Sequence, residues 1–288
     1  METRGTRLVV KAGAFLALAF LYFPLVIVVV YAFDKAAIST WPPSGFTLHW
    51  FVVTWHDPDV RSAFFMSLKA AAGATTIALV LGTTVSFALH RFRFFGRQAI
   101  SFVLILPIAL TGIITGLALN SAISTGNRLF GLSFSLLTII IGHATFCIVV
   151  VFNNVVARLR RTSTNLIDAS SDLGAHGWQT FRYVTLPLIS TALVAGGLLA
   201  FALSFDEIIV TTFTAGSEIT LPIWIFTHIG RGRSLPQVNV VATVVIFLSL
   251  IPVYFAQRLT REAAPPRSQE EQVAEDKEFE TAFEGAAG

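Results

Sequence analysis

The chain has 288 residues, of which 54% are hydrophobic and only 13% are charged. A soluble domain carries about a quarter charged residues, so this composition excludes an ordinary soluble globular protein. The formal net charge of +3 does not indicate nucleic-acid binding, because the basic residues lie in segments that flank apolar runs. The composition therefore predicts an integral membrane protein.

Six apolar runs are long enough to be membrane spans, each of which needs about 20 residues. These runs cover residues 8–33, 63–89, 100–119, 136–157, 188–213 and 238–256. The first run exceeds the apolar core of about 7–15 residues that is typical of a signal peptide, which favours an uncleaved span. The sequence therefore predicts six transmembrane helices.

Residue types that carry catalysis or hold metals do not cluster in the sequence. The single cysteine, Cys147, lies inside an apolar run, so no disulfide can form within the chain. Neither a nucleophile–base arrangement nor a glycine-rich phosphate loop stands out in the sequence. We therefore expect no catalytic residue, no metal site and no cofactor in this chain.

The longest polar interruption, residues 163–187, separates the fourth run from the fifth. Ser163 or Thr164 is placed to cap a short helix. Gly174 is placed to end that helix, because glycine adopts positive φ without steric cost. Pro187 opens the next apolar run, and proline is well tolerated in a first helical turn. The interruption therefore predicts a helix–turn–helix between two spans.

The spacing within this interruption resembles the signature loop of ABC importer permeases. In that loop, Glu-Ala-Ala is followed by three residues, Gly, nine residues, Ile, one residue and Leu-Pro. The matching positions here are Asp168, Ala169, Ser170, Gly174, Val184, Leu186 and Pro187. Asp, Ser and Val replace the family's Glu, second Ala and Ile. The resemblance implies that the segment is a coupling helix that docks into a separate ATPase subunit. The alternative is an interfacial helix that only anchors the loop.

Asp206 and Glu207 are the only carboxylates inside an apolar run, near the end of the fifth. A charge at membrane depth costs about 2.5–3.5 kcal/mol on insertion scales. Neighbouring helical positions diverge by about 100°, so both side chains face one cavity only if the helix is locally bent. Two interpretations stay open, namely a structural pair that binds a basic residue and a site for a cationic substrate.

The surroundings of this pair resemble the second permease of spermidine/putrescine-type ABC importers. The segments that carry the resemblance are Ser204-Phe-Asp-Glu-Ile-Ile-Val, Thr220-Leu-Pro-Ile-Trp and Val238-Asn-Val-Val-Ala-Thr. It covers most of residues 60–257 and implies import of a small solute, a polyamine above all. An importer of another small solute is the alternative. The expected substrate-path residues are His143, Phe205, Asp206, Glu207 and Trp224.

His143 is a lone histidine in the fourth run. Such a residue either binds a polar partner on a neighbouring helix or takes part in function. Together with Asp206 it defines a rival hypothesis, a secondary carrier that relays protons and uses an ion gradient. A membrane scaffold without transport is a further rival, which leaves the acidic pair unexplained.

The resemblance implies an all-α integral membrane protein with the type I ABC importer permease fold. It also implies a complex in the bacterial plasma (inner) membrane. Its partners would be a second permease, two ATPase subunits that bind ATP and Mg, and an extracytoplasmic solute-binding protein. A small cationic solute and membrane lipid are the remaining expected partners, and nucleic acid is not among them.

The chain divides into three parts by composition. Residues 1–62 hold the first span and an extracytoplasmic loop, and residues 63–257 form the permease core. In the tail 258–288, the last 21 residues hold seven acids and one base, which predicts disorder. Fourteen basic residues lie on the side of the amino terminus and five on the other side. The positive-inside rule then places both termini and the loop 163–187 in the cytoplasm.

Overall fold

The protein is all-helical in the computed structural model, which describes residues 4–37, 41–92, 94–109, 112–131, 133–162, 165–231 and 234–262. Within these ranges the only extended pairing is a single bridge between Asp34 and Phe46. The part of the predicted tail from residue 263 and the predicted caps Ser163 and Thr164 lie outside the described residues, whereas residues 258–262 are helical, contrary to the predicted disorder.

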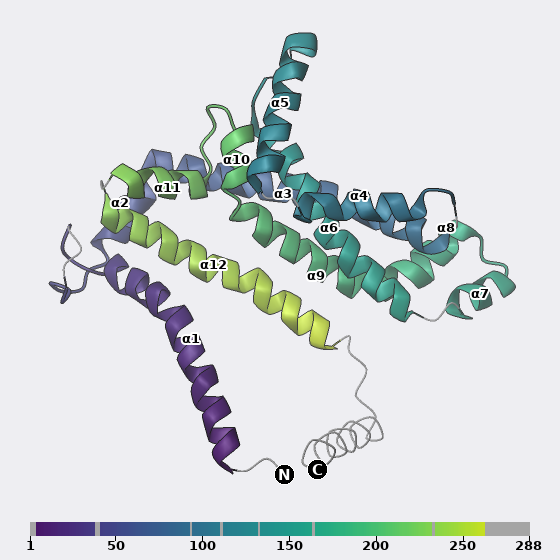
Figure 1. Ribbon diagram of the computed structural model, residues 1–288, viewed down its shortest axis with the longest axis horizontal. Helices are drawn as coiled ribbons and strands as arrows, with labels where there is room; N and C mark the ends of the chain where they lie inside the picture. Colours follow the sequence, from purple (N-terminus) through teal and green to yellow (C-terminus); the bar gives the residue numbers. More distant parts are fainter. Residues whose placement is uncertain are drawn as a thin grey trace, which may run out of the picture.

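Twelve α-helices and one π-helical turn follow one another along the described chain (Figure 1). They are α1 (Arg4–Ala32), α2 (His49–His56), α3 (Pro58–Arg91), α4 (Arg97–Ala109), α5 (Gly112–Phe130), α6 (Leu136–Arg161), α7 (Asn165–Asp172), α8 (Gly177–Thr180), η1 (Phe181–Thr185), α9 (Leu186–Phe205), α10 (Ile209–Thr214), α11 (Leu221–Arg231) and α12 (Leu235–Glu262).

Helices α3, α6 and α9 pack against one another and form the centre of the molecule. Small residues on α3 allow this close approach. A Cβ atom built on Gly73 would lie 2.6 Å from Ile140 Cδ1, and one on Gly82 would lie 2.9 Å from the Ile148 carbonyl oxygen. The glycines of α3 are therefore required by the distance between α3 and α6.

Small residues of α9 pack against α6. A Cβ atom on Gly196 would lie 3.3 Å from Asn154 Cβ, and the Cys147 thiol lies 3.4 Å from the Ala200 carbonyl oxygen. Ala200 and Ser204 are buried. Close packing of α9 on α6 fixes the position of the residues that follow α9.

Four helices of the described chain are long and apolar enough to cross a membrane. They are Val9–Ala32, Pro58–Arg91, Leu136–Arg161 and Gly177–Phe205. Two shorter apolar helices are Leu221–Gly230 and Leu235–Ile251. Figure 1 shows α1 diverging from the bundle. Its Phe15 and Phe20 side chains are 71% and 84% exposed, as expected for a helix that faces lipid.

In the first half of the described chain, two element boundaries differ from the sequence-based expectation. The run 100–119 is divided between α4 and α5, and Figure 1 shows the two helices at a large angle to each other. The second span begins at Pro58 rather than at residue 63. Asp57 explains this earlier start, because its Oδ1 accepts hydrogen bonds from the backbone N–H groups of Asp59 (2.9 Å) and Val60 (3.5 Å).

Asp34 organises the loop that follows α1. Its Oδ1 accepts hydrogen bonds from the Ala36 N–H, the Ser44 N–H and the Ser44 hydroxyl, each at 3.1 Å. The hydrogen bond from Ala36, assisted by those from Ser44, holds the pKa of Asp34 below its usual value although burial opposes this effect. The loop is thereby folded back toward the end of α1.

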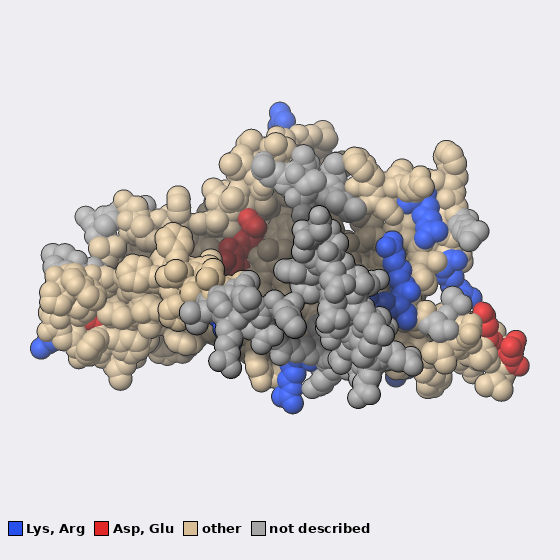
Figure 2. All heavy atoms as spheres, turned by 60° about the horizontal axis from the view of Figure 1, so that its bottom comes forward, with Lys and Arg blue, Asp and Glu red and all other residues tan. Residues whose placement is uncertain are grey.

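The bundle has two ends that matter for function. The loop end carries α7 and α8, and the opposite end carries α2, α11 and the beginnings of α3 and α12 (Figure 1). On the face shown in Figure 2, basic side chains gather mainly toward the loop end.

Candidate functional site

The two candidate sites lie at the two ends of α9. At the loop end, α7 closes with a Schellman motif, in which the Ala175 N–H donates to the Ser170 carbonyl oxygen (3.0 Å) and the Gly174 N–H donates to that of Ser171 (2.9 Å). Gly174 has a φ of +82°, and a Cβ atom added to it would meet no heavy atom within 4 Å. The predicted positive φ of Gly174 is therefore confirmed, and it serves the turn rather than packing.

Side-chain hydrogen bonds tie this segment together. The Ser170 hydroxyl lies 2.9 Å from the Thr180 hydroxyl and so links α7 to α8. The Arg158 guanidinium of α6 donates to the Leu188 carbonyl oxygen (2.9 Å) in the first turn of α9. Leu186 and Pro187 form the start of that turn, as the sequence predicts. These contacts link α7 to α8, and α6 to the first turn of α9.

Apolar side chains of this segment point outward. Leu173, Tyr183 and Trp178 are 88%, 75% and 67% exposed. Asp168 and Ala169 are also exposed. Exposed apolar side chains of this size are typical of a surface that contacts another protein or the membrane.

Asp168 also borders a cavity of about 340 Å³ behind the segment. His90 and Arg91 from the end of α3 line the same cavity, together with Ser171 and Thr180. The Asp168 carboxylate is therefore placed between the outer surface of the loop and the basic end of α3.

At the opposite end, α9 stops at Phe205 and α10 starts at Ile209, so the continuous helix expected over 188–213 is wrong. Asp206, Glu207 and Ile208 form the break between the two helices. The Glu207 Oε1 atom accepts a hydrogen bond from the Val210 N–H (3.0 Å) and so satisfies an otherwise free donor in the first turn of α10. The polar pair therefore interrupts the helix and orients the two carboxylates differently.

His143 connects the two sides of this break. Its Nδ1 lies 2.7 Å from the Ser204 hydroxyl of α9, and its Nε2 lies 2.7 Å from the Thr211 hydroxyl of α10. The Thr211 hydroxyl donates to the Glu207 carbonyl oxygen (2.7 Å) and must accept from His143 Nε2–H. The neutral ring with its proton on Nε2 then accepts from Ser204. His143 is 1% exposed and bridges α9 and α10 across the break.

Residues from α5 and α6 hold the far end of α10. The Asn120 side-chain amide donates to the Phe213 carbonyl oxygen (2.7 Å), and the Thr138 hydroxyl lies 2.8 Å from the Thr214 carbonyl oxygen. These contacts satisfy carbonyl groups that a short helix leaves free. Asn120, Thr138 and Thr211 were not identified from the sequence. A polar residue at the end of an apolar run, such as Asn120, is the signal that could have identified them.

Asp206 lines a cavity of about 150 Å³ between α9 and α12. The rings of Phe201 and Phe205 border it with centroids 6.1 Å apart, and Ser249 faces it from α12. Asp206 is exposed, and its carboxylate has no hydrogen bond or ion pair to any other described residue. An unpaired carboxylate beside two aromatic rings is suited to binding a cation.

The structure separates the five expected path residues into groups. Phe205, Asp206 and Glu207 lie together at the break, and His143 reaches them through Ser204 and Thr211. Trp224 is 2% exposed and stacks on His228, with ring centroids 4.1 Å apart. Trp224 shares an apolar cluster with Phe205 but does not line the Asp206 cavity.

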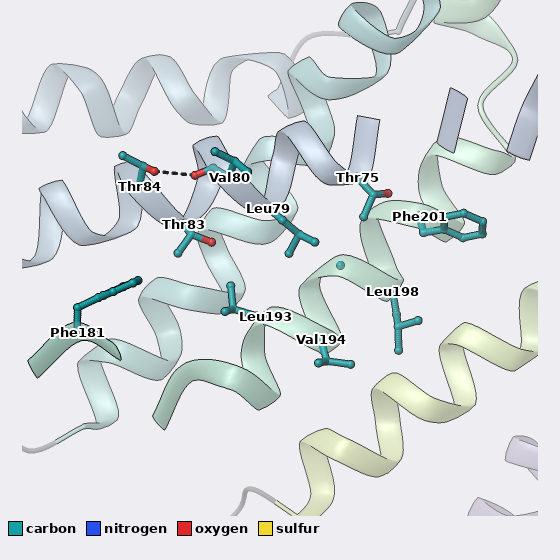
Figure 3. Close-up of a pocket in the computed structure, with 11 residues that line it drawn as sticks. Thr75, Leu79, Val80, Thr83, Thr84, Phe181, Leu193, Val194, Leu198 and Phe201 are labelled. Atoms are coloured by element: carbon teal, nitrogen blue, oxygen red, sulfur yellow. Dashed lines mark hydrogen bonds between the residues drawn. The ribbon is translucent and has the colours of Figure 1, made fainter. Parts of the chain in front are cut away.

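An open groove of about 630 Å³ runs between α3 and α9 (Figure 3). It extends from Phe181 at the loop end to Phe201, which also borders the Asp206 cavity. The Thr75 and Thr83 hydroxyl groups line the groove and are buried without a hydrogen-bond partner in the described part of the chain. The groove therefore links the two candidate sites along one face of α9.

The chain is similar to known transport proteins in sequence. Residues 74–262 match the family of binding-protein-dependent transport system inner membrane components. The spermidine/putrescine transport system permease protein PotC of Haemophilus influenzae is 32% identical over 253 residues, which cover 87% of this chain and 96% of the relative. The putrescine transport system permease protein PotI of Escherichia coli (strain K12) is 34% identical over 236 residues, covering 80% and 83%.

Solved structures show a similar fold. A bacterial ABC transporter that imports the acidic polysaccharide alginate aligns with a TM-score of 0.64 and 18% identity, covering 91% of this chain and 98% of that one. The MetNI methionine ABC transporter aligns with a TM-score of 0.58 and 19% identity, covering 72% and 96%.

Proposed function

Because the chain belongs to the family of binding-protein-dependent transport system inner membrane components, we propose that it forms half of a polyamine path in an ABC importer. It is a multi-pass permease subunit, and ATP hydrolysis in such importers belongs to separate subunits. The relatives named for spermidine and putrescine transport support a polyamine as the solute.

The Asp206 cavity is the observation that carries this proposal. A polyamine has two or more ammonium groups, which lose hydration when they leave water. A carboxylate without a protein partner offsets part of that loss, and its attraction for a cation strengthens as the local dielectric constant falls. The flanking rings of Phe201 and Phe205 add cation–π contacts worth about 0.5–2 kcal/mol each.

The groove between α3 and α9 defines the course of the proposed path along the bundle. Leu79 and Leu193 keep its wall apolar, and a rotation of the buried Thr75 and Thr83 side chains would be needed to turn their unpartnered hydroxyls toward a polar solute. A second permease subunit would close the open side of the groove. The solute would then pass from the break at Asp206 along α9 toward the loop end.

The finer architecture belongs to the same proposal. Six spans in the type I importer arrangement would be supplied by α1, α3, the α4–α5 segment, α6, α9 and α12. Two ATPase subunits that bind ATP and Mg would dock on the exposed loop-end surface around Leu173, Trp178 and Tyr183. A solute-binding protein would deliver the polyamine at the opposite end, in the bacterial plasma membrane.

The orientation, with both termini and the loop end in the cytoplasm, is testable with cysteine variants. Cys147 is fully buried, so the background labelling should be low. Ser124→Cys should react with an impermeant thiol reagent applied outside cells, and Thr162→Cys should react only after the cells are opened. Labelling of Thr162→Cys in intact cells would contradict the orientation.

The substrate proposal is tested by uptake of labelled spermidine or putrescine into proteoliposomes that contain all partner subunits. Asp206→Asn keeps the shape of the side chain and removes its charge. Hydrogen bonds to charged groups contribute about 1.5–3 kcal/mol, so we expect KM to rise at least about tenfold with assembly unchanged. Glu207→Gln keeps an acceptor for the Val210 N–H, so its effect should be smaller.

Glu218→Gln is the matched control, because Glu218 lies in the loop between α10 and α11 and does not line the Asp206 cavity. It should transport normally. Wild-type KM values for Asp206→Asn and for the Asp206→Asn/Glu207→Gln double variant would refute the cation site and favour a neutral or anionic solute.

The rival proton relay through His143 and Asp206 finds no support in these contacts. Both His143 ring nitrogens are bonded to hydroxyl groups, and the residue lines none of the cavities described above. Uptake into vesicles that hold a proton gradient but no ATP would favour that rival.

A further inference from the structure

An apolar cavity next to the Asp206 cavity lies at the end of the bundle that carries α2 and α11, and Leu248 lines both cavities. The apolar cavity has a volume of about 250 Å³ and is enclosed by α2, α3, α11 and α12. Its wall is made mainly of apolar side chains, among them Phe51, Phe64 and Leu248. Phe65 and Val244 line it and are 47% and 45% exposed, so the cavity opens on an apolar surface of the molecule.

A base, Arg61, lines this cavity, and an acid, Asp57, lies just outside the cavity lining at the N-cap of α3. Arg61 is exposed, and its guanidinium has no ion pair within the described ranges. Asp57 lies four residues earlier, one helical turn closer to the end of the bundle. Its Oδ1 caps α3, and its Oδ2 lies 3.4 Å from the Gln237 side-chain amide.

A buried hydroxyl lies between these charged residues and the apolar interior. Thr54 lines the cavity and is 5% exposed, and its Oγ1 has no hydrogen-bond partner in the part of the chain that the structure describes. A buried hydroxyl without a partner costs about 1–3 kcal/mol, so rotation of Thr54 toward an acceptor oxygen of a ligand in the cavity would be favoured.

The depth of the cavity follows the direction of the spans. Along α12 it is lined from Val240 to Leu248, which corresponds to about 12 Å of helix. Arg61 lies one turn into α3, at the outer limit of the cavity, and Leu248 lies deeper in the bundle. A ligand that fits this cavity therefore has a charged group at one end, an acceptor oxygen beside that group, and an apolar chain for the rest of its length.

We propose that this cavity binds one phospholipid whose headgroup pairs a phosphate with an ammonium group, as phosphatidylethanolamine does. The acyl chain fills the apolar interior, and an ester carbonyl oxygen accepts the hydrogen bond of Thr54. The phosphate lies on the Arg61 guanidinium, and the ammonium lies one turn further out on the Asp57 carboxylate.

Bound lipid would support the wall beside the proposed cation site. Phe64 lines the lipid cavity and packs edge-on against Phe205, with ring centroids 6.1 Å apart. Phe205 in turn borders the Asp206 cavity. Contacts of the Phe64 and Phe205 rings therefore connect the lipid to the break between α9 and α10. Lipid binding does not depend on which solute is transported.

The test is native mass spectrometry of the assembled importer, titrated in turn with phosphatidylethanolamine, phosphatidylcholine and phosphatidylglycerol. The wild type should retain one tightly bound phosphatidylethanolamine and bind the other two more weakly. Arg61→Gln and Asp57→Asn should each weaken this binding about tenfold, and asparagine keeps the cap of α3. Thr54→Val should weaken it less, because it removes one neutral hydrogen bond.

Arg128→Gln is the matched control, because Arg128 is an exposed base near the end of α5 that does not line this cavity. It should bind phosphatidylethanolamine as the wild type does. A cavity-filling change, Val244→Phe, should displace the lipid without changing the charge. Loss in Val244→Phe but not in Arg61→Gln would overturn the headgroup assignment. Unchanged binding in all of these variants would overturn the site.

Discussion

Near each end of α9 the chain turns from one helix into another, and different contacts hold the two turns. At the loop end, α7 stops through hydrogen bonds between residues that are close in sequence, such as Ala175 N–H to the Ser170 carbonyl oxygen. At the break after Phe205, local hydrogen bonds of Glu207 are joined by contacts from residues 61 to 93 positions away, namely His143, Thr138 and Asn120. The first turn is built by local sequence, and the second depends on packing as well.

This difference predicts different responses to mutation. A local motif can be disturbed without changing the bundle, because its partners lie in the same segment. A break held by distant helices depends on the packing of α5, α6 and α9, so damage to it should lower the stability of the whole subunit. It should also move Asp206, which has no other described contact to hold its carboxylate.

The largest effect is expected for His143→Leu. The change removes the His143 partner of the buried Ser204 and Thr211 hydroxyls, of which Thr211 keeps its bond to the Glu207 carbonyl oxygen. Together with imperfect packing, it should cost about 2–5 kcal/mol. We expect the melting temperature of the detergent-solubilised complex to fall by several degrees and uptake to be lost. Thermal unfolding and uptake are measured on the same preparation.

A matched pair on α10 separates the break from general damage. Thr211→Val removes the hydroxyl that contacts His143 and the Glu207 carbonyl oxygen, whereas Thr212→Val removes an exposed hydroxyl that bonds only the Ile208 carbonyl oxygen. Thr211→Val should destabilise the complex and Thr212→Val should not. Equal effects of the two variants would show that His143 does not hold the break.

An intermediate effect is expected for Gly174→Val at the loop end. Positive φ costs about 1–2 kcal/mol for a residue with a Cβ atom, and a β-branched side chain tolerates it least. The spans should insert normally, whereas the ATPase subunit should no longer copurify. Gly177→Val is the control, because Gly177 also lies in open space but has no positive φ. Normal ATPase recovery with Gly174→Val would remove the coupling role from this turn.

The same contrast explains what could be predicted from the sequence. Gly174, Leu186 and Pro187 act through local geometry, so their spacing was enough to place the helix–turn–helix. The apolar runs predicted the helices α1, α3, α6 and α12. The start of α3 differs from the prediction because the Asp57 side chain caps the helix before the apolar run begins. The break after Phe205 could not be predicted, because it depends on which polar side chains α5 and α6 bring to α10. Hydrophobic periodicity along one helix carries no such information.

The smallest effect is expected for Ser170→Ala, which restores the residue that the resembling importer loops have at this position. The Ser170 hydroxyl bonds the Ile167 carbonyl oxygen (2.8 Å) and the Thr180 hydroxyl (2.9 Å), and Thr180 is 7% exposed. Its loss should cost about 0.5–1.5 kcal/mol, with ATPase binding unchanged because the backbone of the turn is kept. Ser171→Ala is the control, because the Ser171 hydroxyl bonds only the Ile167 carbonyl oxygen on an exposed surface.

A double-mutant cycle makes this test specific to the contact between α7 and α8. If Ser170 and Thr180 interact directly, Ser170→Ala and Thr180→Val together should cost less than the sum of the two single changes. Stability is read from hydrogen exchange of residues 165–185 in the assembled complex. Strict additivity would show that the two hydroxyls do not act as a pair. Loss of ATPase binding in Ser170→Ala would show that the loop end depends on side-chain contacts rather than on its backbone turn.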